Sequence, residues 1–497
     1  MPVARPRLAR ERRAPEHPAG EHRPRLRLPQ PRLSQPRLPR PHLLRAAAAV
    51  TLVAALAAAC ATDSSTSESA QAPAGATGTI PQLAADQKVS IVFESYNLLS
   101  TGTWKPVVEG LIAQFEKEHP NITVKGQPPQ GVTSGNEYTT SIKNQVLAGN
   151  PPDVGQITFN ALRFAATSLG AAPIDTLVGK GALAANYAGA HPYAPSVPKL
   201  GEVDGRTYAV PYVFSTPVMW INKTLFAQAG LDPANPPKTW ADVRAAALAI
   251  KARTGKEGVE VNCLTKQTVD WCWQSMVLSN GGRVMAPDAS RLTFADAPAV
   301  ETVAMSQDLV RSGAMPNLDQ QQALKAFSSG QLGMMVESSA VQAALMAGAK
   351  ANNWELGATG EPGFGSKPVV PTNSGSALAI FSKDPAKQRA AWELIKFLTS
   401  DYAYTQISSK IGYLPLRTGL IDDPNGLQAW AKANPLIRPN LDQLTRLQPW
   451  AAFPGDNYLQ IQDTMMTAVE GAVFSGKDPA ATLASAQKQA SDLMPAR

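Results

Sequence analysis

The chain has 497 residues, of which 44% are hydrophobic, and this is enough for two globular lobes. Its formal net charge of +7 comes from the N-terminus, because residues 1–60 hold 12 Arg and three Glu, whereas the rest holds 34 Lys and Arg against 36 Asp and Glu. The body is therefore nearly neutral, so the positive net charge of the whole chain is not evidence for nucleic-acid binding.

Two N-terminal segments precede the body. Residues 1–45 are rich in Pro and Arg without apolar periodicity, so we expect a disordered basic leader. Residues 46–60, AAAAVTLVAALAAAC, form an apolar run that is too short to span a bilayer stably and ends in small residues before Cys60. This run resembles a bacterial lipoprotein signal, which implies lipidation at Cys60 and anchoring outside the cell membrane. A simple anchor helix or an ordinary signal peptide is the alternative.

A tether and a cysteine pair follow. Residues 61–85 are rich in Ser, Thr, Ala and Gly, and this composition predicts a flexible tether. Beyond it, the only cysteines are Cys263 and Cys272. In an oxidising compartment they could form a disulfide that stabilises the fold by about 2 to 3 kcal/mol; two free buried thiols are the alternative.

The first part of the body alternates strands and helices. VSIVFES at 89–95 has the alternation of a strand, and a helical apolar stripe of Val107, Leu111 and Phe115 then ends at His119-Pro120. The segment NITVKG predicts a second strand, a helix with Tyr138 on its apolar stripe follows, and VGQI predicts a third strand. This β-α-β-α-β pattern indicates an α/β fold with parallel strands, in which ligands lie beyond the carboxyl ends of the strands.

A second unit begins after the Asp204-Gly205 turn. TYAVPYVF and PVMWI predict two extended segments, and 222–230 predicts a short helix. Thr239 is placed to cap the next helix, since Asp242 lies three residues on. Near the C-terminus, QRAAWELIKFLTS and residues 463–494 are helical by spacing and propensity.

Five motifs carry a resemblance to a known family. They are LAGNPPDV (147–154), STPVMWINKTLFAQAGLDPANPPKTWADV (215–243), FSSGQLGMM (327–335), KIGYLP (410–415) and FSGKDPAATL (474–483). In this order they resemble the extracellular solute-binding proteins of carbohydrate-type ABC importers over most of residues 87–497. Within that family, the second motif, Ser338-Ser339 and TNSGSALAI most resemble the binders of glycerol 3-phosphate and glycerophosphodiesters.

The resemblance implies a two-lobed periplasmic-binding fold of type II, with discontinuous lobes joined by strand crossovers around a ligand cleft. Crossovers are expected near Ser215, Met335 and Gly375. These give a first lobe of 86–214 plus 335–377 and a second lobe of 218–332 plus 381–497. The implied function is capture of a small polar solute and delivery to an ABC permease, by a monomer that needs no cofactor and no metal.

A cleft for a solute with many hydroxyl groups needs aromatic faces and fixed hydrogen-bonding groups. By resemblance, Tyr138 matches a cleft tyrosine, Trp271 and Trp273 lie near a cleft tryptophan, and four positions match hydrogen-bonding residues. These four are Ser215, Ser339, Gly375 and Tyr413. For each aromatic residue, burial in the core is the alternative.

Two departures from the glycerol-phosphate binders bear on the ligand. Those proteins place an arginine before the last long helix to grip phosphate in a bidentate way, whereas this chain has PWAAFPGDNY with Pro454 near the aligned position. A family carboxylate after the third strand is replaced, since the chain reads ITFNALR. The sequence therefore favours a neutral sugar or a masked phosphodiester, with Asn160, Trp450 and Asp456 as candidate contacts; loop packing or helix capping is the alternative for these three.

An enzyme is the rival class. After Cys60 the chain has only His119 and His191, and it has no H-E-x-x-H, no G-x-S-x-G and no paired-cysteine zinc spacing. Ser485 and Lys488 fit S-x-x-K, but they lie in a predicted surface helix. A glycan hydrolase based on two carboxylates stays open, because such pairs have no fixed spacing, and so does an adhesin without a small ligand.

Overall fold

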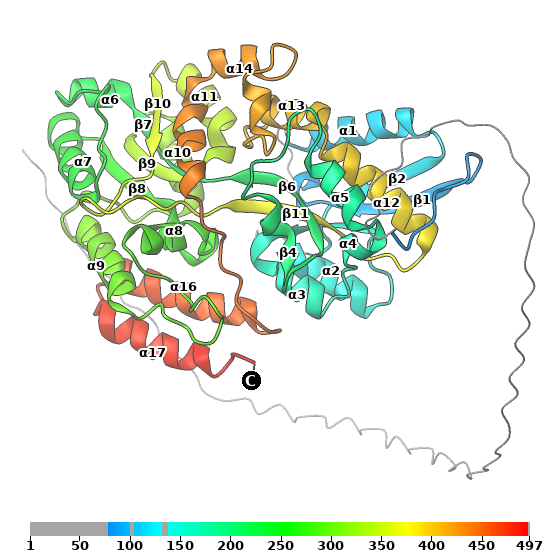
Figure 1. Cartoon of the computed structure of the whole chain (residues 1–497). Helices are drawn as coiled ribbons and strands as arrows, with labels where there is room; N and C mark the ends of the chain where they lie inside the picture. The colour runs from blue at the N-terminus through cyan, green and yellow to red at the C-terminus, as the bar shows by residue number, and fades with distance from the viewer. Residues whose placement is uncertain (1–77, 100–103, 132–137, 496–497) are drawn as a thin grey trace, which may run out of the picture. The chain divides into compact units, whose positions relative to one another are not determined.

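The computed structural model describes residues 78–99, 104–131 and 138–495, which lie in one compact unit spanning residues 72–497. The basic leader, the apolar run, Cys60 and most of the predicted tether therefore lie outside the described residues. Two main sheets, each flanked by helices, make up the described part (Figure 1).

The first sheet has five strands in the order β2-β1-β3-β11-β6. Its strands are β1 (Val89–Glu94), β2 (Ile122–Gln127), β3 (Val154–Thr158), β6 (Ala209–Ser215) and β11 (Ser374–Ile380). The three N-terminal strands run parallel, as the alternating pattern predicts, and β11 lies antiparallel between β3 and β6. A short ladder of β4 (Glu202–Val203) and β5 (Arg206–Thr207) is separate from this sheet.

The second sheet has four strands in the order β10-β7-β9-β8. They are β7 (Pro217–Asn222), β8 (Glu257–Val261), β9 (Leu332–Ser338) and β10 (Leu356–Gly360). Strand β9 is parallel to β8 and antiparallel to β7. Every residue of β7 and of β9 is buried, because these two strands lie in the middle of the second sheet; both are mostly apolar and carry polar residues at their carboxyl ends.

The helices include those that the spacing of apolar residues predicts. Those with the first sheet are α1 (Trp104–Glu118), α2 (Tyr138–Leu147), α3 (Leu162–Thr167), α4 (Ile174–Leu177), α5 (Lys180–Tyr187), α12 (Pro385–Leu398) and α13 (Asp401–Lys410). Those with the second are α6 (Lys223–Gln228), α7 (Trp240–Thr254), α8 (Trp271–Ser279), α9 (Ala297–Arg311), α10 (Gln320–Ser328), α11 (Gln342–Ala351), α15 (Arg438–Gln443), α16 (Tyr458–Ser475) and α17 (Pro479–Ser491). Helix α14 (Gln428–Ala433) lies on the connection between them. The capping box of Thr239 and Asp242 at the start of α7 is confirmed.

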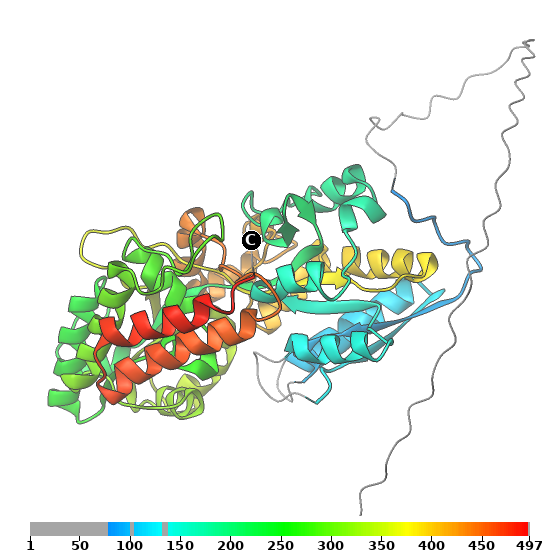
Figure 2. The same ribbon diagram turned by 90° about the horizontal axis from the view of Figure 1, so that it is seen from below.

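The C-terminal helical region is broken in the middle. Helix α16 ends at Gly476, which has a left-handed φ of 68°, and Asp478 caps α17, with Pro479 at its first position. These are ordinary stop and start signals for helices. The two helices pack side by side (Figure 2), rather than as the single helical stretch that the spacing suggested.

The predicted lobe boundaries need correction. Strands β9 and β10 hydrogen-bond to β7 and β8, so residues 335–360 belong to the second lobe and Met335 is not at a crossover. Conversely, α12 and α13 pack against the first sheet, so the start of the segment 381–497 belongs to the first lobe. The chain crosses at Thr216, between β10 and β11, and after α13. Backbone pairing partners, which a strand's own sequence does not reveal, decide these assignments.

The described end of the predicted tether is not free. Ile80 is buried and donates its N–H to Leu177, while the Arg389 guanidinium donates to the carbonyls of Ile80 and Pro81. Residues 79–81 are thus docked on the first lobe, and the tether prediction was wrong there.

Candidate functional site

A cleft of about 350 Å³ lies where strands of both sheets end. The first lobe lines it with Tyr96, Trp104, Tyr138, Thr158, Asn160, Ser215, Ser374, Gly375 and Tyr413. The second lobe lines it with Gln267, Thr268, Val269, Trp271, Gln320, Glu337, Ser338, Ala340, Val341 and Trp450. Residues that follow β1, β3, β6 and β9 meet here, which fits the rule that α/β sheets bind ligands at strand ends.

Aromatic rings form the first-lobe wall. Tyr96 and Tyr138 stack with centroids 4.7 Å apart, and Trp104 lies 5.5 Å from Tyr413 at an angle of 40°. Burial raises the pKa of the Tyr96 and Tyr413 hydroxyls above their ordinary value, so both stay protonated and can donate hydrogen bonds. This wall offers apolar faces together with hydroxyl groups, which is the combination that a polyhydroxyl solute needs.

Gly375 lies where β11 passes β6 at the edge of the cleft. Its φ is 116°, and a Cβ there would lie 2.0 Å from the carbonyl oxygen of Val213. Only glycine fits this backbone. Gly375 thus brings the main chain of β11 to the cleft, next to Ser374 and Ser215.

Polar groups form the floor. The Ser338 hydroxyl donates to the Ser215 hydroxyl at 2.9 Å, and the Glu337 carboxylate accepts from the Ser338 backbone N–H at 2.6 Å. Burial raises the pKa of Glu337 to about 7, opposed by the hydrogen bonds from Ser338 and Gln320. Burial, with Glu337 nearby, likewise raises the pKa of Glu260 on the adjacent strand β8.

A disulfide holds the loop that supplies much of the second-lobe wall. Cys263 and Cys272 are bonded, as one of the two sequence alternatives proposed. The enclosed loop contributes Gln267, Thr268, Val269 and Trp271 to the cleft. Val269 has a φ of 67° and a ψ of −179°, a backbone conformation that is costly for a β-branched residue. The loop is therefore held in a conformation that it would not adopt as a free peptide.

Seven of the ten predicted ligand contacts line the cleft. They are Tyr138, Asn160, Ser215, Trp271, Gly375, Tyr413 and Trp450. Tyr96, Thr158 and Glu337 were missed, although the strand-end rule applied to β1, β3 and β9 could have found them.

The other three predicted contacts do not line the cleft. Trp273 is fully buried in the core. It lies two residues after Trp271 in α8, so its side chain points about 200° away from that of Trp271 around the helix axis. Ser339 is 1% exposed, and its hydroxyl is buried without a partner. Asp456 is exposed and accepts a hydrogen bond from Ser168 at 2.5 Å.

The cleft continues outward. Gln267 also lines an adjoining hollow of about 670 Å³, together with Thr140, Lys266, Asp319 and Asp463, among others. This outer hollow carries charged groups of both signs, whereas the inner cleft carries only Glu337 among the charged side chains of the described residues.

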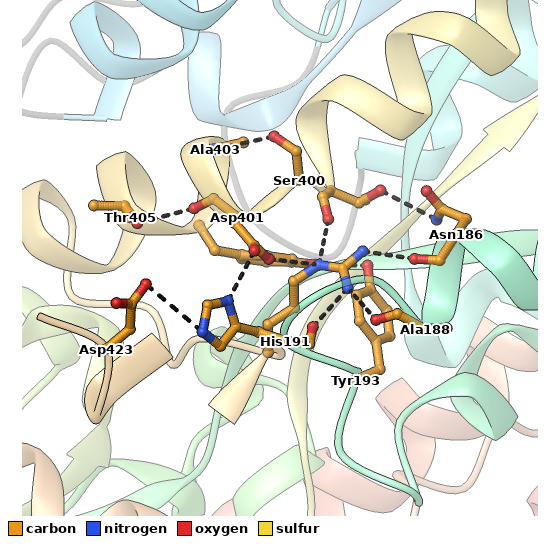
Figure 3. Close-up of polar contacts among 12 residues, drawn as sticks. Asn186, Ala188, His191, Tyr193, Ser400, Asp401, Ala403, Thr405 and Asp423 are labelled. Atoms are coloured by element: carbon orange, nitrogen blue, oxygen red, sulfur yellow. Dashed lines mark hydrogen bonds and ion pairs between the residues drawn. The ribbon is translucent and has the colours of Figure 1, made fainter. Parts of the chain in front are cut away.

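A second polar cluster lies in the first lobe around His191 (Figure 3), and Arg417 joins it through the His191 carbonyl and Asp401. The His191 ring has Asp401 2.8 Å from Nδ1 and Asp423 3.6 Å from Nε2. The Arg417 guanidinium donates to the carbonyls of Thr399, Ala188, His191 and Asn186. Through these contacts the cluster joins several segments of the first lobe.

In the part of the chain that the structure describes, no group of three or more His, Cys, Asp or Glu side chains is arranged to hold a metal ion. Within the same ranges, none of the helices combines the length and apolar character needed to cross a bilayer.

Residues 100–404 match the family described as bacterial extracellular solute-binding protein. The sn-glycerol-3-phosphate-binding periplasmic protein UgpB of Agrobacterium fabrum is 27% identical over 286 residues, which cover 56% of this chain and 64% of that protein. UgpB of Brucella melitensis is 26% identical over 294 residues, covering 56% of this chain and 65% of that protein. The chain thus covers less than two thirds of the length of these relatives.

Solved structures share the fold over a longer range. UgpB from Mycobacterium tuberculosis, in complex with glycerophosphocholine, superposes with a TM-score of 0.69 at 23% identity and covers 81% of this chain and 98% of its own. The cyclic alpha-maltosyl-1,6-maltose binding protein from Arthrobacter globiformis superposes at 0.67 with 20% identity, covering 82% and 98%. The predicted two-lobed α/β fold is confirmed.

Proposed function

Since the chain belongs to the bacterial extracellular solute-binding proteins, we propose that it is the substrate-binding component of an ABC importer. Its ligand would be an uncharged or charge-shielded solute, either a sugar or a glycerophosphodiester, which it delivers to the membrane permease. The observation that carries this proposal is the cleft between the lobes, where both lobes supply aromatic faces and polar groups.

The charges of the inner cleft favour such a solute over a phosphate monoester. Among the described residues that line it there is no Lys or Arg, and the one charged side chain is the acid Glu337. A phosphate dianion would find no cation to balance its charge in this buried site and, wherever Glu337 is ionised, would also meet a carboxylate, both of which are unfavourable. A sugar or a zwitterionic diester avoids this penalty. The relatives named for glycerol 3-phosphate therefore do not fix the ligand of this chain.

Capture would work by closure of the two lobes. The strands β6 and β7 are separated only by Thr216, whose hydroxyl donates to Asn440 at 2.8 Å, and this crossover lies directly beside the cleft. A ligand that contacts both walls favours the closed arrangement, since its contacts are complete only there. The permease would then recognise the closed protein.

The chain would act as a monomer without turnover. A carboxylate-based glycosidase needs two acids that flank the bond to be cleaved, and of the described residues lining the inner cleft only Glu337 is an acid. Incubation with labelled oligosaccharides tests this. Saturable one-to-one binding without product supports a binding protein, whereas turnover contradicts it.

Anchoring of the protein at Cys60 is part of the proposal. The apolar run and the small residues before Cys60 support it, and the docking of residues 79–81 on Arg389 would set the start of the tether. Labelling of cells with a clickable palmitate tests it: wild type should carry label at the membrane and Cys60→Ala should not. Equal labelling of both proteins would contradict the anchor.

Calorimetric titration with trehalose, maltose, glycerophosphocholine and glycerol 3-phosphate decides the ligand class. We expect binding of at least one of the first three and weak or absent binding of glycerol 3-phosphate. Tight binding of glycerol 3-phosphate would contradict the charge argument, and the absence of binding across a wider panel of sugars and diesters would contradict the proposed function.

A further inference from the structure

A buried carboxylate lies behind the second-lobe wall of the cleft. Asp270 is 0% exposed and does not line the cleft itself. It accepts hydrogen bonds from three side chains: the Trp450 indole at 3.0 Å, the Gln274 amide at 2.6 Å and the Gln462 amide. One of these donors, Trp450, does line the cleft.

The contact with Gln462 extends to a residue of the opposite lobe. A carboxylate is only an acceptor, so Gln462 must turn its NH₂ group towards Asp270 and its carbonyl oxygen away. That oxygen accepts from the Nδ2 group of Asn160 at 3.4 Å. The Oδ1 atom of Asn160 is then the last acceptor in this series of hydrogen bonds, and it is buried without a partner.

The cleft therefore presents acceptors. Among the side chains that line it, the two buried polar atoms without a partner in the described structure are Asn160 Oδ1, which accepts hydrogen bonds, and Glu337 Oε2, which accepts them when Glu337 is ionised. A buried acceptor without a donor is unfavourable by about 1 to 3 kcal/mol, so a ligand that supplies donors gains from both. Hydroxyl groups of a sugar or glycerol unit have this chemistry, whereas the oxygens of an ionised phosphate do not.

We propose that Asp270 is a positioning residue that fixes the hydrogen-bond polarity of the cleft, so that Asn160 offers its carbonyl oxygen to a hydroxyl donor of the solute. This inference rests on the proposed function for the identity of the solute. The orientation of Asn160 can, however, be tested without any ligand.

The charge state of Asp270 is compatible with this role. Burial raises the pKa of Asp270 to about 6, opposed by the hydrogen bonds from Gln274, Gln462 and Trp450, so the carboxylate is ionised at pH 7 and becomes protonated below pH 6. The charged groups on the neighbouring segments are Lys266, Asp463 and Glu470. Lys266 pairs with Asp463 at 3.3 Å through Nζ and with Glu470 at 2.8 Å through its backbone N–H.

Ligand-free NMR tests the chain of contacts. The protein is labelled with ¹⁵N at Trp and Asn. The Trp450 indole signal and the Asn160 side-chain amide signal are assigned by their loss in Trp450→Phe and Asn160→Asp. In wild type, both signals should titrate together with an apparent pKa near 6. In Gln462→Leu the Asn160 signal should stop following pH while the Trp450 signal still does. Asp456→Asn, an exposed acid bonded to Ser168, is the matched control and should change neither. Independent behaviour of the two signals in wild type would overturn the proposal.

Binding supplies the second test, with whichever of trehalose, maltose and glycerophosphocholine binds wild type as the probe. Gln462→Leu leaves Asp270 with two donors and frees Asn160 to turn, so affinity should fall by at least tenfold. Adding Asn160→Asp in that background should recover most of the loss, because a carboxylate offers an acceptor in either orientation.

A purely structural role for Gln462 predicts no such recovery, and failure of the rescue would overturn the inference. If no member of the wider panel of sugars and diesters binds wild type, the proposed function fails while the NMR result still decides the role of Asp270.

Discussion

The indole of Trp104 lies 5.5 Å from the ring of Tyr413, between the start of α1 and the end of α13. These two residues are far apart in the sequence, and both line the cleft. Gly412, with a φ of 103°, precedes Tyr413, and Leu414 donates its backbone N–H to Phe214 beside the crossover. The ring of Tyr413 is thus fixed by the same backbone that joins the two lobes.

Tyr413→Ala should weaken ligand binding by about 1 to 3 kcal/mol, because it removes a buried aromatic face and a hydroxyl donor from the cleft. Tyr413→Phe should retain most of the ring contribution and lose only the hydroxyl contribution. Calorimetry with the best-bound member of the sugar and diester panel measures both. Unchanged affinity in Tyr413→Ala would exclude Tyr413 from the binding site.

The double variant Cys263→Ser/Cys272→Ser should lower the free energy of unfolding by about 2 to 3 kcal/mol, since the unfolded chain gains freedom without the disulfide. Hydrogen exchange of residues 264–271 should also accelerate, because this loop carries the unfavourable backbone of Val269. Urea denaturation and mass-spectrometric exchange measure the two effects. Wild type treated with a reductant is the control and should behave like the variant. Wild-type exchange rates in the variant would show that the disulfide does not hold the loop.

The protein should lose stability as pH rises from about 5 to about 8. Burial raises the pKa of Glu361 from its ordinary value of 4.5 to about 8, opposed by a hydrogen bond from Ser275, and raises the pKa of Glu337 to about 7. Within this window the folded state retains protons that the unfolded chain releases, so the free energy of unfolding falls as pH increases. Urea unfolding at several pH values measures the slope.

Glu361→Gln should flatten this pH dependence by an amount on the order of a few kcal/mol across the window, because glutamine does not titrate. Glu355→Gln is the control, since Glu355 is exposed and pairs with Lys223 at the surface. An unaltered slope in Glu361→Gln would mean that this carboxyl does not hold its proton in the folded state.

Arg417→Ala should destabilise the first lobe by about 3 kcal/mol or more without changing ligand affinity. The guanidinium is almost fully buried, donates to four carbonyls and lies 4.8 Å from the ring of Tyr193, so its removal leaves several acceptors unpaired. Arg438→Ala, at an exposed position, is the matched control. Urea denaturation measures the stability of Arg417→Ala, and calorimetric titration measures its ligand affinity. Weaker binding at unchanged stability would contradict the prediction.

Local sequence patterns predicted individual strands, helices and helix caps well. The alternation in VSIVFES, the apolar stripe of α1 and the capping box at Thr239 depend on residues within a few positions of each other, and all three are present. The order of the five motifs likewise indicated the family, and seven of the ten predicted contacts line the cleft.

Non-local hydrogen bonds decided what sequence patterns could not. Leu332–Ser338 reads as a buried strand by itself, but only its pairing with β7 and β8 places it in the second lobe. The choice between Trp271 and Trp273 depends on which face of α8 meets the core, and neither residue type distinguishes them.

By itself, the sequence determined the order of strands and helices in the first lobe, the family and the aromatic character of the cleft, because helix and strand preferences act over short distances. The tertiary structure alone decided that Asp270, Gln462 and Asn160 meet, since these residues come from three distant segments. Their hydrogen bonds form only once both lobes have folded, and for this reason no local pattern reveals them.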